Sequence, residues 1–131
     1  MFKFLRRNFK NAERENIRKG REGEDIACAY LKRKGYRIIE RNFRASVGEI
    51  DIIARDDKYT VFVEVKMRVS DDFAKPEENV DYSKQQKIKR CAELYLLQNG
   101  LYDTDCRFDV VSIKSNGKEE KIELIRNAFS I

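Results

Sequence analysis

The chain has 131 residues and a mass of 15.5 kDa, the size of a single domain. Hydrophobic residues make up 41% of the chain, and no apolar run approaches the ~18 residues of a membrane span. The sequence holds no histidine, which excludes a Ser-His-Asp triad and imidazole-ligated metal sites. Acid–base or metal chemistry must therefore come from carboxylates, lysine, tyrosine or cysteine.

The first half of the chain predicts one helix followed by three strands. Apolar residues recur at helical spacing over 20–34, and Gly35 ends that helix. Alternating or β-branched segments then predict strands over 36–43, 48–54 and 60–66.

The second half predicts a helix and two further strands. Residues 67–81 are irregular and polar around Pro76, and Ser83 is the expected cap of a helix over 84–98. Strands are expected over 107–113 and 121–125. The order α-β-β-β-α-β-β is that of an α/β domain with a mixed sheet flanked by helices.

The positive charge is concentrated at the N-terminus. Residues 1–22 hold eight basic and three acidic residues and so carry the whole net charge of +5. We interpret residues 1–19 as a basic arm, which suits a phosphate backbone, and 20–131 as one folded domain. Aromatic and apolar side chains in the arm could stack on bases, insert at a membrane surface or fold back, and a solvated terminus is an equal alternative: Phe2, Phe4, Leu5 and Phe9.

The cysteines indicate the cellular compartment of the protein rather than a metal site. Cys28, Cys91 and Cys106 are far apart and form no CxxC pair, so we expect reduced thiols that serve as small buried side chains. An odd count without a signal peptide predicts a cytoplasmic protein.

Two neighbouring strands place acidic residues within an apolar context. Alternation puts Glu64 and Lys66 on one face of the third strand, roughly 6.6 Å apart. In the preceding strand Glu49 and Asp51 share a face. A short turn at Asp56 and Asp57 makes the strands antiparallel neighbours, so Asp51 and Glu64 are expected to point into the same space.

This set supplies the parts of a divalent-metal site. Mg²⁺ takes oxygen ligands and needs only one or two carboxylates beside waters and a substrate phosphate. A lysine beside the ion can orient water or offset charge on the phosphate. The alternative is a charged face of a one-sided sheet that simply points to solvent.

The pattern Gly48-Glu49-Ile50-Asp51, twelve residues, then Glu64-Val65-Lys66 resembles the PD-(D/E)xK nuclease superfamily, whose restriction-endonuclease-like core is a mixed sheet with flanking helices. More closely, the chain is similar to the YraN-like family of uncharacterised bacterial proteins. The matching segments cover most of residues 20–113: Gly20, Gly23-Glu24, Ala27, Tyr30-Leu31, Gly35-Tyr36, Arg41-Asn42-Phe43-Arg44, GEIDIIA, FVEVKMR and RFDVV.

The resemblance implies a role for each residue of the motif. Asp51 and Glu64 would bind Mg²⁺, with Mn²⁺ as a substitute, and the carbonyl of Val65 would be a third ligand. Lys66 would position or activate the attacking water. Archaeal Holliday-junction resolvases of the same superfamily carry a further glutamate on the first helix, where Glu24 falls. Glu49 either pairs with an arginine such as Arg44 or touches the metal.

We therefore expect a metal-dependent nuclease that hydrolyses phosphodiesters in DNA, including branched or structured DNA. The first alternative is a nucleic-acid-binding module that keeps the fold without turnover; the second is a protein-interaction module that docks through the arm. A substrate with two strands to cut would favour a homodimer, and no membrane association is expected. Basic residues that could contact nucleic acid, or simply form an exposed face, are Arg18, Lys19, Arg21, Arg44, Arg68, Lys84, Lys87 and Arg90.

Overall fold

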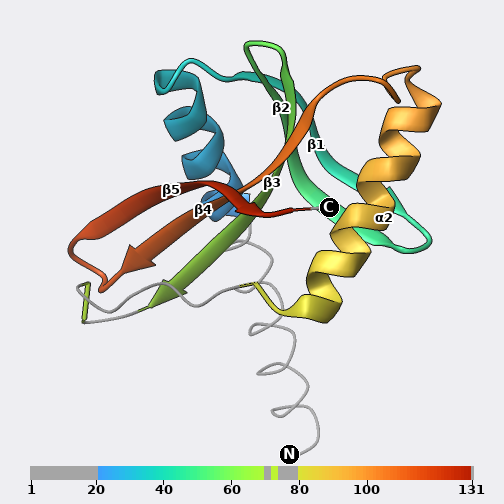
Figure 1. Cartoon of the computed structure of the whole chain (residues 1–131). Helices are drawn as coiled ribbons and strands as arrows, with labels where there is room; N and C mark the ends of the chain where they lie inside the picture. The colour runs from blue at the N-terminus through green and yellow to red at the C-terminus, as the bar shows by residue number, and fades with distance from the viewer. Residues whose placement is uncertain (1–20, 70–71, 74–79, 131) are drawn as a thin grey trace, which may run out of the picture.

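The computed structural model describes residues 21–69, 72–73 and 80–130. The proposed arm, with Arg18 and Lys19, lies outside them. The elements follow the expected order α-β-β-β-α-β-β (Figure 1). They are a helix over residues 21–33, β1 (Arg37–Ala45), β2 (Gly48–Asp56), β3 (Tyr59–Val69), α2 (Tyr82–Gln98), β4 (Cys106–Ser115) and β5 (Glu120–Phe129).

The predicted elements are confirmed, but every strand runs further than predicted, β5 to Phe129 rather than to residue 125. Two of the differences, in β3 and at the cap of α2, have a clear physical reason. β3 runs on to Val69, so residues 67–69 are strand rather than irregular chain, because they continue to pair with β4. The cap of α2 is Asp81 and not Ser83. The Asp81 carboxylate accepts a hydrogen bond of 2.7 Å from the Ser83 backbone amide, and the helix starts at Tyr82, two residues earlier than expected.

The five strands form one mixed sheet in the order β1-β2-β3-β4-β5. β3 and β4 are parallel, and α2 makes the crossover between them; the other neighbours are antiparallel. In the described part of the chain no helix is long and apolar enough to cross a membrane.

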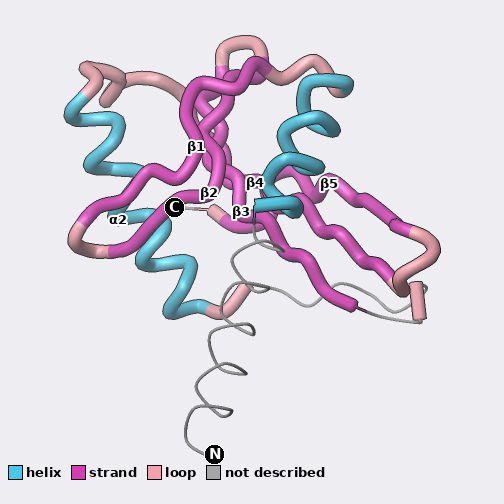
Figure 2. Tube along the Cα trace, turned by 180° about the vertical axis from the view of Figure 1, so that it is seen from behind, coloured by secondary structure: helices cyan, strands magenta, loops and turns pink. Residues whose placement is uncertain are grey.

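Each face of the sheet is covered by one helix (Figure 2). Val61 and Val63 of β3 pack against the 21–33 helix, whereas Phe62 between them packs against α2, as alternation predicts. Cys28 and Cys91 are buried in these two cores, one on each side, in agreement with the expected structural role.

The β1–β2 ribbon exchanges its two faces partway along its length. Ile52 packs on the side of the 21–33 helix and Ile50 on the side of α2, although strict alternation predicts one face for both. In β1, Asn42 has a left-handed φ of 55°, and beyond it Phe43, the partner of Ile50, packs against α2. The twist at this level leaves Asp51 between the two faces.

The RFDVV segment has a structural role that its sequence pattern does not indicate. Asp109 is 0% exposed and accepts hydrogen bonds from the Tyr36 hydroxyl at 2.8 Å, the Arg107 guanidinium at 2.9 and 3.0 Å and the Asn127 amide at 2.9 Å. Arg107 also pairs with Asp56 at 2.8 Å. This buried network ties β4 to β5, to the end of β2 and to the start of β1.

The Asp109→Ala variant should lose about 3 kcal/mol of unfolding free energy, because it leaves buried hydrogen-bond donors without their acceptor. Urea denaturation at pH 7 measures this loss. A loss below about 0.5 kcal/mol, the range of ordinary surface substitutions, would contradict a structural role for the network.

Candidate metal centre

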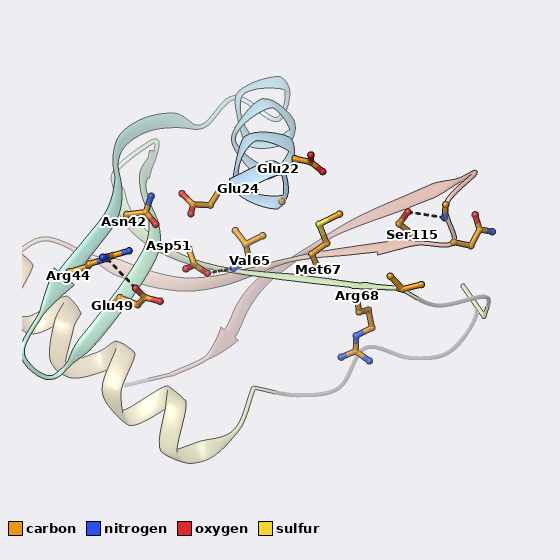
Figure 3. Close-up of a pocket in the computed structure, with 14 residues that line it drawn as sticks. Glu22, Glu24, Asn42, Arg44, Glu49, Asp51, Val65, Met67, Arg68 and Ser115 are labelled. Carbon is orange, nitrogen blue, oxygen red and sulfur yellow. Dashed lines mark hydrogen bonds and ion pairs between the residues drawn. The ribbon is translucent and has the colours of Figure 1, made fainter. Parts of the chain in front are cut away.

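The candidate site lies where β2 and β3 stop pairing. Their register runs from the Asp56–Tyr59 pair to the Ile52–Val63 pair and ends there. If it continued, Asp51 would lie opposite Glu64. Instead, the carboxylate of Asp51 accepts a hydrogen bond of 2.8 Å from the backbone amide of Val65 (Figure 3). A side chain thus replaces the missing strand partner and fixes the Asp51 carboxylate beside β3.

The two acidic side chains expected to meet are in contact. Asp51 and Glu64 lie close enough to share a proton when one of the two carboxyls is protonated, and Glu64 is only 6% exposed. Burial raises the pKa of Asp51 to about 7, and the negative charge of Glu64 acts in the same direction, against the Val65 amide and Lys84. The pair therefore concentrates negative charge in a poorly hydrated place.

Lys84, in the first turn of α2, forms an ion pair with Glu64. Burial lowers the pKa of Lys84, but the hydrogen bond and charge of Glu64 outweigh it, so the pKa is raised. The sequence predicts Lys84 on an exposed face that could contact nucleic acid and does not predict this ion pair with Glu64. Its signal in the sequence is weak, because no spacing rule relates the start of α2 to β3.

A cleft of about 730 Å³ opens beside Asp51, between the 21–33 helix, β1, β3 and the β4–β5 turn (Figure 3). Glu24 lines this cleft from the helix but is held by Arg41 of β1 at 3.3 Å. In the described part of the chain no group of three histidine, cysteine or acidic side chains is close enough to bind a metal. Glu24 thus lies near the pair without joining it, and its role as a ligand stays a prediction.

Glu49 takes the first of the two roles left open for it. Its carboxylate pairs with Arg44 at 3.5 Å, and both side chains are exposed at the rim of the cleft. Gly48 precedes it with a φ of 148°, and a Cβ there would lie 3.4 Å from the Cβ of Lys87. That contact would be ordinary, so glycine is required at this turn by its positive φ, which other residues rarely adopt.

The other predicted residues lie on β3, on α2 and on the first helix. Lys66 is half-buried on β3, opposite Ser112 of β4 in the register. Arg68 lines the 730 Å³ cleft, and Lys87 lines a second cleft of about 440 Å³ together with Lys84. Arg21 and Arg90 are exposed, on the first helix and on α2.

The donor set fits a hard divalent cation. Two carboxylates in contact supply oxygen ligands of the kind that Mg²⁺ and Mn²⁺ take, and these ions keep several waters beside one or two carboxylates. A bound cation would offset the repulsion between the two carboxylates. Asp51 and Glu64 would hold the ion, and the carbonyl of Val65 stays a predicted third ligand.

The Asp51→Asn variant should be more stable than the parent in EDTA at pH 8, by roughly 1–3 kcal/mol. The raised pKa means that Asp51 is favoured in the folded state only while protonated. That contribution is complete below pH 4 and is lost as pH rises through about 7, whereas asparagine keeps the acceptor for the Val65 amide without the charge.

Urea denaturation between pH 4 and pH 8 measures this difference, with Glu49→Gln as the control. Glu49 is an exposed carboxylate two residues away on the same strand, and its removal should change stability by less than about 0.5 kcal/mol. A stability gap between Asp51→Asn and the parent that does not widen with pH would contradict charge repulsion within the pair.

Comparison with known proteins gives the chain a family. Residues 23–113 match the model of the uncharacterised protein family UPF0102. A UPF0102 protein of Thermodesulfovibrio yellowstonii is 50% identical over 113 residues, which cover 86% of this chain and 96% of that protein. UPF0102 proteins of Persephonella marina and Syntrophus aciditrophicus are 47% and 45% identical over 86% and 89% of this chain, and over 94% and 92% of their own lengths. The chain thus belongs to the uncharacterised protein family UPF0102, the YraN family that the sequence motifs indicated.

Proposed function

We propose that the protein is a Mg²⁺-dependent nuclease that hydrolyses phosphodiester bonds in DNA, with branched or otherwise structured DNA as its substrate. Mn²⁺ would substitute for Mg²⁺. The observation that carries the proposal is the contact between Asp51 and Glu64 at the point where β2 and β3 separate. A buried carboxylate and a half-buried one held together against their own repulsion are typical of a functional site rather than of a stabilising one.

The chemistry divides among the residues of the site. Asp51 and Glu64 would bind the ion, which when bound polarises a phosphoryl group and acidifies water. The Val65 amide holds the Asp51 carboxylate at β3, so this ligand is positioned before any ion arrives. Lys66 would orient the attacking water or offset negative charge on the phosphate, as a positioned cation does in phosphoryl transfer.

The surroundings of the pair suit a nucleic-acid strand. Clefts of about 730 Å³ and 440 Å³ border the site. Arg44 and Arg68 line the first beside several acidic residues, and Lys84 and Lys87 line the second beside Glu49 and Asp81. A phosphate backbone bound across both would be met by cations on either side of the acidic pair. A homodimer would let two such sites act on the two strands of a branched duplex.

Cleavage of labelled DNA tests the proposal. Duplex, single-stranded and four-way-junction DNA, and RNA of matching sequence, are incubated with Mg²⁺ or Mn²⁺. We expect cleavage of junction DNA that EDTA abolishes. Asp51→Asn, Glu64→Gln and Lys66→Ala should each lower the rate by about 10²–10³-fold.

The control is Glu93→Gln, which removes an exposed carboxylate from α2 and should leave the rate unchanged. Equal cleavage by the parent and by Asp51→Asn would show that the nuclease activity belongs elsewhere, in the protein or in a contaminant. Metal-independent binding of DNA without cleavage of any substrate would favour the alternative of a binding module.

A further inference from the structure

The ion pair of Lys84 joins an exposed side chain to a buried one. The Lys84 side chain is 55% exposed, whereas that of Glu64 is 6% exposed. The lysine stem therefore lies in solvent, and its ammonium reaches inward to a carboxylate that water hardly touches. This differs from an ordinary surface ion pair, in which both partners are hydrated.

The ammonium of Lys84 supplies what a metal would supply. Asp51 and Glu64 together carry two negative charges when ionised, and Lys84 offsets one of them. A divalent ion bound between the carboxylates would offset both. Ammonium and metal ion would then lie close together on Glu64, where like charges repel, so the two cations compete for the same carboxylate.

The position of Lys84 also gives its ammonium another place to go. Lys84 and Lys87, one turn apart on α2, line the 440 Å³ cleft next to the site, together with Glu49 and Asp81. A flexible four-carbon stem that is more than half exposed can turn from Glu64 into this cleft without disturbing the core. There, two lysines would face a phosphate of a bound strand.

We infer that Lys84 occupies the cation position beside Glu64 until a divalent ion enters, and that its ammonium then moves to a phosphate oxygen of the substrate. When no metal is bound, Lys84 would thereby stabilise the close approach of Asp51 and Glu64 in the folded protein. When metal enters, Lys84 would couple metal binding to phosphate binding. The inference rests on the proposed metal-dependent function, but it concerns a residue outside the Asp51, Glu64 and Lys66 set.

Calorimetric titration of the full chain with Mn²⁺ at pH 8.5, where protons compete little for the carboxyls, tests the inference. Lys84→Gln removes the charge and keeps a hydrogen-bond donor for Glu64. Lys87→Met, the control, removes the same charge one turn further along α2. We expect Lys84→Gln to bind Mn²⁺ about tenfold more tightly than the parent, Lys87→Met to stay within about twofold, and Lys84→Arg to stay near the parent.

The cleavage assay supplies a second measurement. At saturating Mn²⁺, Lys84→Gln should cut DNA at least tenfold more slowly than the parent despite its tighter metal binding, because a phosphate ligand is lost. Mn²⁺ binding by Lys84→Gln that is equal to or weaker than that of the parent would overturn the inference while leaving the proposed function intact. If neither the parent nor Lys84→Gln binds Mn²⁺, both proposals fail together.

Discussion

The separation of β2 from β3 after Ile52 is the constraint on which the site depends. If the strand pairing continued, a backbone carbonyl of β2 would accept the hydrogen bond of the Val65 amide. Asp51 would then be an ordinary side chain on the face of a sheet. Because the pairing stops, the Asp51 carboxylate accepts the hydrogen bond of the Val65 backbone amide and comes close to Glu64. The local break in the strand pairing therefore positions the Asp51 carboxylate. It also places that carboxylate next to the negative charge of Glu64, which contributes to its raised pKa.

The rest of the fold holds this break in place. On one side the sheet is buried under the 21–33 helix, and on the other under α2, so β2 and β3 are each held by packing on both faces. The network around Asp109 fixes the far end of β2 through Asp56 and Arg107. At the near end, the β1–β2 turn at Gly48 lies against α2. Helix packing and hydrogen bonds elsewhere in the fold therefore offset the unfavourable repulsion between Asp51 and Glu64.

The sequence alone predicts much of this arrangement. The β-branched run of β3 and the short turn at Asp56 and Asp57 identify the hairpin, and alternation within β3 correctly places Glu64 on the opposite face from Val63. The opposite faces of Ile50 and Ile52 escape prediction, because alternation assumes a strand that does not twist over. The Lys84 contact escapes because it depends on how α2 docks, which no local pattern encodes.

The most direct test is a crystal structure of the protein grown or soaked with Mn²⁺, in which anomalous scattering locates the ion. The account predicts one anomalous peak shared by carboxylate oxygens of Asp51 and Glu64, with the Lys84 ammonium withdrawn from Glu64. An ion bound elsewhere, for instance at Glu24 alone, or no peak at saturating Mn²⁺ with the Lys84 pair intact, would contradict it.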